Sequence, residues 1–431
     1  MTKDGLEALY QKFLSCGVIS TDTRNLPKGC LYLSLKGNNF NGNSFAGQAL
    51  KDGAAFAVVD EANFATSENH ILVEDGLRTL QELARRHRDS FSIPVLGITG
   101  SNGKTTTKEL LTAVLPKHFK THVTKGNLNN HIGVPLTILS MPVDTEVAVI
   151  EMGANHIGDN EELCAIFNPN LGIITNIGKE HLEGFGDLEG VAKGNSELYA
   201  HLLKYGGRAF VNANDELLMR MAARLPDVVT YAVDSDADYS ATATKLNPDI
   251  ILEKIGLGKI QSHLFGGYNA DNVLAAVAIS LHLGVPFEKI QAGIAEYMPS
   301  NNRSQVVEAG SNTIVVDCYN ANPSSMELAV RNFCSIETSK QQVLILGDMF
   351  EMGGHEASEH EAIAQLAVNL KPDKIYLCGR AFQSAAREYT LDWCENAEAL
   401  KTYLKEHPLN NSTVLLKGSR GMRMETLLEC F

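Results

Sequence analysis

A glycine-rich turn followed by lysine and threonine is the segment of the chain best suited to chemistry. The apolar run Val95–Ile98 stops at this turn, and a helical pattern begins directly after it. Glycines let backbone N–H groups close on phosphate oxygens, and a helix start adds the positive end of its dipole. The order strand, turn, helix predicts a nucleotide phosphate loop made of Gly100, Ser101, Asn102, Gly103, Lys104, Thr105 and Thr106.

The types of two loop residues indicate their roles. Lys104 is expected to reach the β- and γ-phosphates, and Thr105 to offer its hydroxyl to Mg²⁺. The usual phosphate loop has four residues between its first glycine and Gly-Lys. Here five residues separate Gly97 from Gly103, and two separate Gly100 from Gly103. We therefore predict a phosphate loop with non-standard spacing.

Two further apolar runs end in side chains that could bind metal. Glu151 follows Val147–Ile150, and His181 follows Gly172–Thr175 at a distance of six residues. A carboxylate at a strand end beside a phosphate loop suits Mg²⁺, so Glu151 is predicted as a metal ligand. His181 could bind a second metal ion or orient a phosphate oxygen, and a plain surface role is the alternative.

Other polar residues lie where a substrate could bind. The segment 124–131, which contains Asn129, is rich in amides and is either a substrate-binding loop or a turn-rich surface loop. Asp317 ends an apolar run and could accept ribose hydroxyls, while Arg303 could clamp a phosphate. Further polar residues after expected strands or near them are Tyr319, Asn320, Asn322, Asp348 and Lys417.

Alternating strands and helices are expected to position these residues. From Val95 onward apolar runs alternate with helical patterns, as a parallel sheet requires, and ligands bind beyond the carboxyl ends of such strands. We predict an α/β protein of three domains: a small α/β module (1–90), a central phosphate-loop domain (91–301) and a doubly wound C-terminal domain (302–431).

Composition limits the classes of partner. The 431 residues carry 37 basic and 51 acidic side chains, a net charge of −14, which argues against broad nucleic-acid or membrane-surface binding. The eight cysteines form no C-x-x-C pair, the chain start lacks a signal-peptide pattern, and no apolar run reaches a membrane span. We expect a cytoplasmic protein and a monomer.

Taken together, these segments resemble the Mur ligases, the ATP-dependent amide-forming enzymes of peptidoglycan synthesis. The resemblance rests on the phosphate loop with its spacing and on five further segments. It covers the whole chain through 100–106, 127–135, 151–155, 175–184, 317–326 and 346–353. Within the family, the last two segments are similar to those of the ligases that add a D-alanyl-D-alanine dipeptide.

The resemblance implies a reaction and its cofactors. ATP and Mg²⁺ are expected between the central and C-terminal domains, where the carboxylate of a UDP-MurNAc-tripeptide becomes an acyl phosphate. The amine of D-alanyl-D-alanine then displaces phosphate. It implies that Lys104 and His181 are catalytic, that Thr105, Glu151 and His181 hold metal, and that Asn272, Arg303 and Asp317 bind ATP. The acceptor region would include Asn129 and the polar residues of the C-terminal domain named above.

The N-terminal module resembles the family's uridine-nucleotide domain. The matching residues are Thr21, Asp22, Thr23, Arg24, Lys36 and Asn41. Many relatives read Asp-Gly-His at the second of these loops, where this chain reads Asn41-Gly-Asn43.

A second departure lies in 190–199. Many Mur ligases place a carbamylated lysine here to bridge a second Mg²⁺, and that position falls on Asn195 in this chain. Lys193 lies two residues earlier and would face another side of the helix. Asn195 is therefore expected to be a catalytic residue that contacts the metal or the acyl phosphate as a neutral group, or else the second metal site is weak.

Two alternatives remain open from the sequence. One is a related ligase of the folylpolyglutamate synthase type, against which the segment 319–323 and the N-terminal module argue. The other is a phosphate-loop switch without an acyl substrate, which would leave the polar strand ends of the third domain unexplained.

Overall fold

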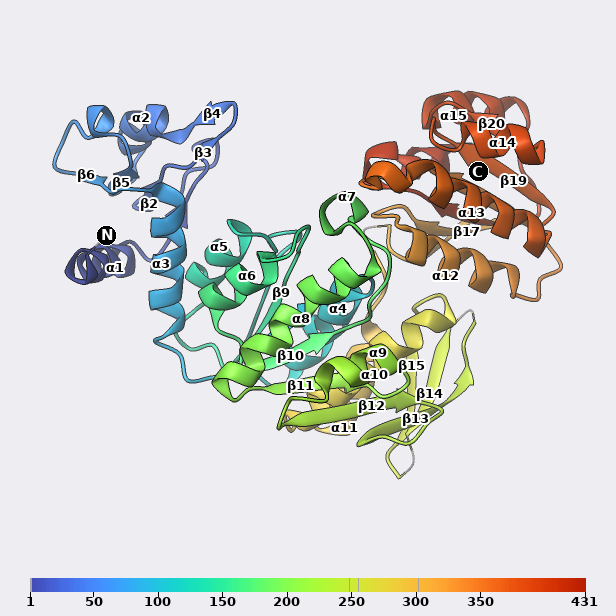
Figure 1. Cartoon of the computed structure of the whole chain (residues 1–431), viewed down its shortest axis with the longest axis horizontal. Helices are drawn as coiled ribbons and strands as arrows, with labels where there is room; N and C mark the ends of the chain where they lie inside the picture. Colours follow the sequence, from blue (N-terminus) through green and yellow to red (C-terminus); the bar gives the residue numbers. More distant parts are fainter. Residues whose placement is uncertain (1, 248, 255, 301) are drawn as a thin grey trace.

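The computed structural model describes residues 2–247, 249–254, 256–300 and 302–431. Three sheets follow one another along the chain, and each is the centre of a separate α/β unit (Figure 1). Met1 and Asn301, at which two of the predicted domains begin or end, lie outside the described residues.

The N-terminal unit is a small parallel sheet with the strand order β1-β2-β5-β6. A short antiparallel hairpin, β3–β4, follows β2. Asp75 caps the long helix α3 through a hydrogen bond from the Arg78 N–H, 2.8 Å long. The elements are α1 Lys3–Cys16, β1 Ile19–Ser20, β2 Leu31–Leu33, β3 Lys36–Gly37, β4 Phe40–Asn41, α2 Ala46–Lys51, β5 Phe56–Val59, β6 His70–Leu72 and α3 Gly76–Arg88.

The central unit is built on nine strands in the order β15-β14-β13-β12-β11-β10-β7-β9-β8. All five residues of β7 are buried, as expected for an apolar strand covered on both faces of a parallel sheet. The strands are β7 Val95–Thr99, β8 Thr121–Val123, β9 Val147–Glu151, β10 Leu171–Ile174, β11 Arg208–Asn212, β12 Val228–Val233, β13 Tyr239–Lys245, β14 Ile250–Lys254 and β15 Gly258–Ser262.

The central sheet is parallel from β8 to β13 and antiparallel beyond. The sequence predicted the parallel part, and the antiparallel edge of β14 and β15 is a feature that it did not predict. Helices cover both faces and bury two separate apolar cores. They are α4 Lys104–Val114, α5 Gly133–Leu139, α6 Asp159–Phe167, α7 Leu182–Phe185, α8 Leu188–Tyr205, α9 Glu216–Ala222, α10 Ala270–His282 and α11 Phe287–Glu296.

The C-terminal unit is a doubly wound sheet, as predicted, with the order β16-β17-β21-β18-β19-β20. One core lies under α12, α13 and α14, and a second core lies under α15 on the opposite face. Its elements are β16 Gln305–Ala309, β17 Asn312–Asp317, α12 Pro323–Cys334, β18 Gln341–Gly347, α13 Glu356–Leu370, β19 Lys374–Cys378, α14 Gln383–Tyr389, β20 Asp392–Cys394, α15 Ala397–Glu406 and β21 Ser412–Lys417.

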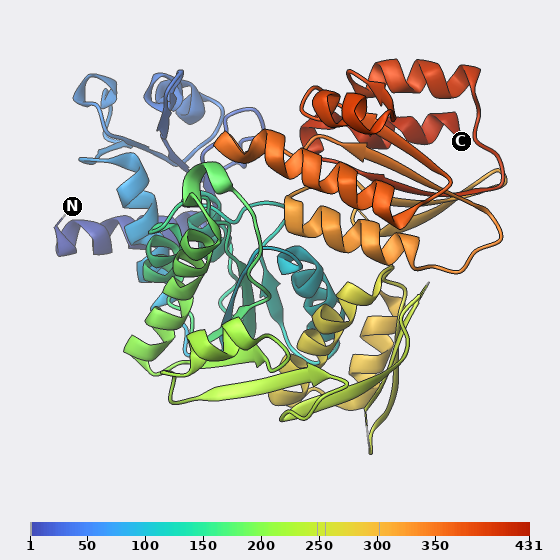
Figure 2. The same cartoon turned by 45° about the vertical axis from the view of Figure 1, so that its right-hand side comes forward.

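The three units are arranged around the central sheet. The N-terminal and C-terminal units lie on opposite sides of the molecule, and α12 faces the central unit across a junction (Figures 1 and 2). The carboxyl ends of β7, β9 and β10 therefore point toward the C-terminal unit, where the predicted site residues follow these strands.

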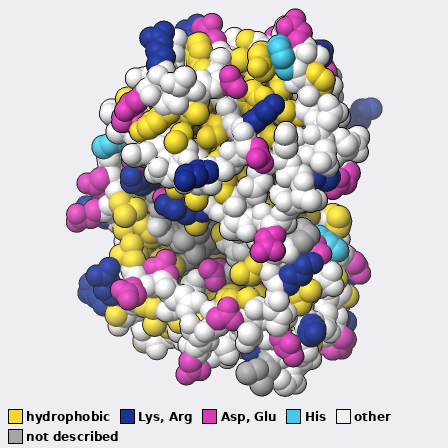
Figure 3. Space-filling view, turned by 90° about the vertical axis from the view of Figure 1, so that its right-hand side faces the viewer, with side chains coloured by type: hydrophobic (Ala, Val, Ile, Leu, Met, Phe, Trp, Pro, Cys, Tyr) yellow, Lys and Arg dark blue, Asp and Glu magenta, His cyan; other side chains and the backbone are white. Residues whose placement is uncertain are grey.

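Surface charge and hydrophobicity agree with the composition. Basic and acidic side chains are interspersed on the face that carries the C-terminal unit, without one dominant basic patch (Figure 3). Across the described part of the chain, each helix is too short or too polar to cross a bilayer.

Candidate active site

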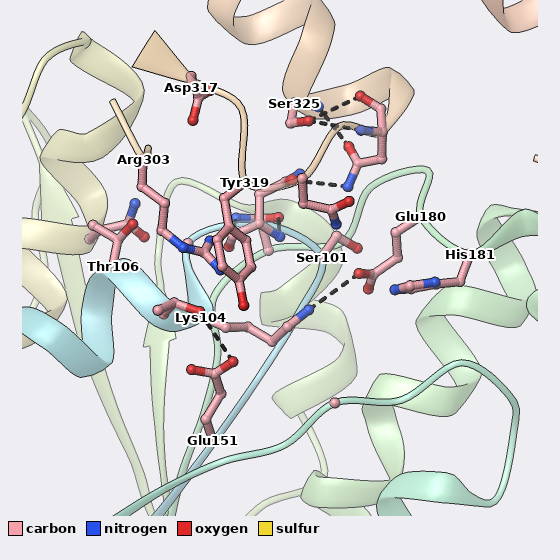
Figure 4. A pocket seen from close by; sticks show the side chains of 18 of the residues that line it. Ser101, Lys104, Thr106, Glu151, Glu180, His181, Arg303, Asp317, Tyr319 and Ser325 are labelled. Carbon is pink, nitrogen blue, oxygen red and sulfur yellow. Dashed lines mark hydrogen bonds and ion pairs between the residues drawn. The ribbon is translucent and has the colours of Figure 1, made fainter. Parts of the chain in front are cut away.

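A polar cleft of about 400 Å³ lies between the central and C-terminal units. The phosphate loop, Glu151 and His181 line its central side (Figure 4). The residues that line its other side include Arg303, Asp317 and Lys417. The cleft therefore brings together residues that the sequence separates by more than two hundred positions.

The phosphate loop depends on two glycines with left-handed backbone. Gly100 has a φ of 122° and Gly103 a φ of 84°. A Cβ at Gly100 would lie 2.3 Å from Thr175 Oγ1, and one at Gly103 would lie 2.3 Å from Asn272 Oδ1. Both positions thus require glycine for conformation and for space. Helix α4 begins at Lys104 directly after Gly103, so its first N–H groups are directed at the loop.

Lys104 is held across the loop by two oxygen acceptors. Its Nζ donates to the carbonyl of Gly100 and lies 3.2 Å from Glu180 Oε2 (Figure 4). The Glu180 side chain is only 4% exposed, so this ion pair is largely shielded from water. Sequence reasoning did not select Glu180, although its position directly before His181 was a signal that could have found it.

Glu151 lies at the centre of a group of donors. Its Oε1 accepts hydrogen bonds from Thr105 Oγ1 at 3.1 Å and from Asn129 Nδ2 at 3.0 Å. Its Oε2 forms an ion pair with Nζ of Lys108 at 3.1 Å, but the two atoms do not have hydrogen-bond geometry. The Lys108 side chain is only 1% exposed. Lys108 was missed in the sequence, although it lies one helical turn after Lys104 on α4.

The donor set near Glu151 fits Mg²⁺. Among the described residues no group of three or more His, Cys, Asp or Glu side chains could hold a metal ion. Mg²⁺ bound with a nucleotide needs few protein ligands, because phosphate oxygens and waters complete its octahedron. A hydroxyl and a carboxylate in contact, as Thr105 and Glu151 are, would supply the protein's share.

His181 lines the same cleft but has a partner from the other unit. Its Nδ1 pairs with the carboxylate of Glu351, which lies in the loop after β18. The hydrogen bond from His181 lowers the pKa of Glu351 below its usual value. Glu351 also lines the cleft and was not among the predicted site residues, because no local pattern shows that it meets His181.

The other amino acids predicted to bind ATP lie on either side of the phosphate loop. Asn272 is buried beside Gly103, accepts a hydrogen bond from Thr107 Oγ1 at 3.3 Å and donates to Asn269 Oδ1 at 2.9 Å. Asp317 lies 2.5 Å from Lys417 Nζ and accepts from the N–H of Ser304 at 3.3 Å. Asp317 and Lys417 end the neighbouring strands β17 and β21, which explains why they meet.

The segment after β17 forms the opposite wall. The guanidinium of Arg303 lies 3.7 Å from the ring centre of Tyr319. Asn320 lines the cleft, and its carbonyl accepts from Lys417 Nζ at 3.5 Å. Asn322 caps α12 in a capping box, and its Nδ2 donates to Asn102 Oδ1 of the phosphate loop at 3.1 Å.

Asp348, which was predicted in the acceptor region, is not among the residues that line the cleft. Its carboxylate is buried and accepts the N–H groups of Ala381 at 3.1 Å and Phe382 at 3.3 Å, away from the cleft. A Cβ on Gly379 would overlap this carboxylate, so the turn before α14 is built around it. Burial raises the pKa of Asp348 above its usual value.

Asn195 is likewise absent from the residues that line the cleft. Its side chain is 2% exposed; its Oδ1 accepts from Thr99 Oγ1 at 2.7 Å and its Nδ2 donates to the carbonyl of Val191 at 3.0 Å. The structure therefore places Asn195 behind β7, where both ends of its amide are used. Lys193 is exposed on another side of α8, as expected from the spacing.

The amino acids predicted to bind the uridine nucleotide lie on the N-terminal unit, outside this cleft. Segment 21–24 follows β1 and Lys36 follows β2, so they lie at the same edge of a parallel sheet. Arg24 binds Asp22 through both carboxylate oxygens, which lowers the pKa of Asp22 to about 2. Lys36 Nζ lies 3.0 Å from Asp60 Oδ1, and Asn41 donates to Glu61 Oε1 at 3.0 Å.

Asn43 is fully buried, unlike Lys36 and Asn41. It donates to Asp60 Oδ1 at 2.7 Å and accepts from the Asp60 N–H at 2.9 Å. It therefore supports the loop from inside rather than offering its amide to a ligand.

Comparison with known proteins gives a consistent result over the whole chain. Family models match at residues 17–88 (Mur ligase family, catalytic domain), 98–280 (Mur ligase middle domain) and 302–420 (Mur ligase, glutamate ligase domain). The chain is 34% identical to the UDP-N-acetylmuramoyl-tripeptide–D-alanyl-D-alanine ligase of Bacillus subtilis, covering 97% of this chain and 94% of that protein.

Solved structures agree in fold. MurF from Acinetobacter baumannii superposes with a TM-score of 0.87 and 30% identity, over 99% of this chain and 98% of that chain. MurF ligase from Thermotoga maritima in complex with ADP superposes with a TM-score of 0.84 and 26% identity, over 100% and 98% of the two chains. From the family models and the near full-length identity, this chain belongs to the Mur ligase family.

Proposed function

We propose that this chain is an ATP-dependent ligase that joins D-alanyl-D-alanine to UDP-N-acetylmuramoyl-tripeptide. The observation that carries the proposal is the cleft in which a phosphate loop faces Arg303 and Asp317 of another unit. Relatives named for this reaction match along nearly the whole chain. We further propose that it acts in the cytoplasm as a monomer.

Each unit takes one part of the reaction. Residues 1–90 bind the uridine nucleotide through the edge formed by Thr21, Asp22, Thr23, Arg24, Lys36 and Asn41. Residues 91–301 bind ATP, and residues 302–431 bind the dipeptide and close on the nucleotide. The cleft between the last two units supports this division, because its two walls carry the phosphate loop and the polar ends of β17 and β21.

The phosphate loop holds the nucleotide. The N–H groups of 100–106 surround the phosphates, Lys104 bridges toward the γ-phosphate, and Asn272 lies beside the loop for the base. Arg303 balances phosphate charge from the other wall, and Asp317 accepts the ribose hydroxyls. When Mg²⁺ is bound, held by Thr105 and Glu151 with His181 near a second position, it neutralises charge that develops on the phosphates.

The chemistry then proceeds in two displacements. The peptide carboxylate oxygen attacks the γ-phosphorus, the bond from that phosphorus to the β-phosphate oxygen breaks, and ADP leaves. The dipeptide amine attacks the acyl carbon, the carbon–oxygen bond to phosphate breaks, and the proton that the amine loses passes to the departing phosphate. Lys104 stabilises the charge on the transferred phosphoryl group in both steps, because it is fixed before the reaction by Gly100 and Glu180.

The amides around the cleft hold the acceptor groups. Asn129 holds Glu151 in place, and Asn320, Asn322 and Tyr319 form the wall on which the amine component arrives. Asn195 acts from behind β7 as a positioning residue through Thr99, rather than as a catalytic group.

The test is phosphate release from ATP with UDP-MurNAc-tripeptide, with and without D-alanyl-D-alanine, combined with mass analysis of the nucleotide product. We expect turnover only with both substrates and a product with the mass of the pentapeptide nucleotide. ATP hydrolysis that is indifferent to both would overturn the proposal and favour a phosphate-loop switch. Ligation of glutamate to a folate instead would point to the other ligase type.

A further inference from the structure

A second pocket of about 330 Å³ adjoins the active-site cleft. It shares Thr105, Arg303 and Tyr319 with the cleft, so the two form one connected space. Its volume is at the lower end of the range of roughly 300–1,000 Å³ that is usual for small-molecule sites. Neither Lys104 nor Glu151 lines it, and its lining residues all come from the central and C-terminal units. It is therefore open to the reaction centre, and Thr105 and Arg303 form its border with the site proposed for the nucleotide's phosphates.

Two guanidinium groups meet in this pocket on one aromatic ring. Arg303 lies 3.7 Å and Arg420 lies 5.0 Å from the ring centre of Tyr319. Arg420 Nη1 also donates to the Tyr319 hydroxyl at 3.4 Å, which limits the positions of its long side chain. No carboxylate forms an ion pair with Arg420 among the residues that the structure describes. The pocket thus presents a restrained cation whose fork of donors suits a carboxylate.

An unsatisfied acceptor lies in the same pocket. Oε2 of Glu425 is buried and has no hydrogen-bond partner within the described part of the chain, and Glu425 lines the pocket. A buried carboxylate oxygen without a donor costs free energy unless a ligand supplies one. Within the described residues, the pocket therefore combines a guanidinium that has no ion-pair partner with a carboxylate oxygen that has no donor, which is the complement of a small zwitterion or a peptide end.

We propose that this pocket holds the incoming dipeptide, with the terminal carboxylate on Arg420 and an N–H group of the dipeptide on Glu425. The proposal rests on the proposed function and adds the residues that select for a free carboxylate. A dipeptide anchored here is connected through the shared residues Thr105 and Tyr319 to the place where the acyl phosphate forms. Arg303 remains available to the nucleotide, since it borders both spaces.

The experiment compares D-alanyl-D-alanine with its C-terminal amide as amine substrates. We expect the wild-type enzyme to have a KM for the acid at least about tenfold lower than for the amide, because a bidentate charged pair is lost with the amide. The Arg420→Gln variant should raise the KM for the acid at least about tenfold and leave the KM values for the amide and for ATP unchanged. The preference for the acid should therefore disappear.

Two further variants sharpen the test. Arg420→Lys keeps the charge without the fork and should recover part of the preference. Glu425→Gln should raise the KM for acid and amide alike, since it acts on the N–H group and not on the carboxylate. Arg387→Gln, an exposed arginine on α14 outside both pockets, is the matched control and should change neither.

Other results would overturn the proposal. A wild-type enzyme that uses acid and amide equally well would show that no residue reads the carboxylate. An Arg420→Gln variant with a raised KM for ATP and an intact acid preference would assign Arg420 to the nucleotide.

Failure of the proposed function is distinguishable from failure of this inference. If the wild-type enzyme ligates a different amine, the same acid and amide comparison on that amine decides the role of Arg420. Binding of D-alanyl-D-alanine to the ADP-bound enzyme, followed by ligand-observed NMR, gives a second readout without turnover. Binding there that is equal for wild type and Arg420→Gln would also overturn the proposal.

Discussion

The N-terminal and C-terminal units meet the central unit through junctions that differ in how much apolar surface they bury. At the first, one buried apolar cluster runs without interruption from α1 and α3 into α5, α6 and α8. Phe13 of α1 and Phe167 of α6 belong to that same cluster. Polar side chains of α3 also cross this junction, as Gln81 does when it donates to Glu162 at 2.6 Å. Its centre is nevertheless a close-packed apolar core, which leaves few alternative arrangements.

The second junction is mostly polar. Ser324 accepts the N–H of Lys179 at 2.8 Å, Lys179 pairs with Glu359 at 2.6 Å, and Asn322 reaches Asn102. The C-terminal cores are otherwise built from their own unit, with Phe265 added from the central one. Polar contacts that face a cleft can be exchanged for water at little cost, so this junction is suited to open and close around substrates.

The largest expected effect is a loss of catalytic rate, caused by a substitution at the polar junction. Replacing Lys104 with Met should lower kcat about 10³-fold, or about 4 kcal/mol, because the transferred phosphoryl group loses its fixed cation. The measurement is single-turnover formation of ADP with all three substrates at saturation. A loss confined to the KM for ATP would mean that Lys104 serves binding and not the transition state.

At the apolar junction we expect an effect on stability instead. Phe13 is 2% exposed, and its ring lies 5.4 Å from that of His87 on α3. Phe13→Ala should destabilise the joined core by about 3 kcal/mol, measured as a lower urea midpoint, with kcat per folded molecule unchanged. Leu14→Ala, at an exposed position of the same helix, is the control and should leave the midpoint almost unchanged. A strong loss of kcat in Phe13→Ala would break the contrast between the two junctions.

The sequence was informative where the chemistry is local. The phosphate loop and Glu151 at the end of β9 both follow from short patterns, since turns and strand ends are set by neighbouring residues. Pairings between units were not predictable in this way. Glu351 meets His181 only because α7 and the loop after β18 are brought together by folding.

Side-chain direction was a second limit. Asp348 follows an apolar strand as Glu151 does, yet it turns toward the N–H groups before α14 instead of the cleft. Asn195 lies on the correct helix, but its amide is used by Thr99 and Val191. The antiparallel edge was missed because β14 and β15 are short, and polar residues interrupt both strands, so that neither gave a long continuous apolar run.

A smaller effect is expected from the ion pair that joins the two units. Lys179 is 48% exposed and Glu359 is 11% exposed, so solvent weakens their attraction. A double-mutant cycle with Lys179→Gln and Glu359→Gln should give a coupling of about 0.5 kcal/mol in kcat/KM for ATP, roughly a twofold change.

Salt gives the control for this cycle. The coupling should disappear at high ionic strength, where exposed charges are screened. Lys117→Gln, which removes a 2.6 Å ion pair within the central unit, should leave kcat/KM unchanged. A coupling above about 2 kcal/mol that persists in salt would show that this junction is rigid like the first one.

The most subtle effect is a pH dependence at the apolar junction. His87 is buried between the two units, with Nδ1 3.2 Å from the Tyr10 hydroxyl and Nε2 3.2 Å from the carbonyl of Met141. Burial lowers the pKa of His87 below its usual value, with a minor contribution from the charge of Arg86, so the folded protein binds fewer protons here than the unfolded chain. The stability that His87 contributes is therefore complete above the unfolded pKa of about 6.5 and is lost as the pH falls through the folded pKa.

His87→Gln keeps a polar side chain without titration and should flatten the decline of the urea midpoint below pH 6.5, compared with wild type. His131→Gln, at an exposed histidine, should leave that decline unchanged. An identical decline in wild type and His87→Gln would mean that protons enter at another buried histidine, and that the apolar junction is not the part of the molecule that acid opens first.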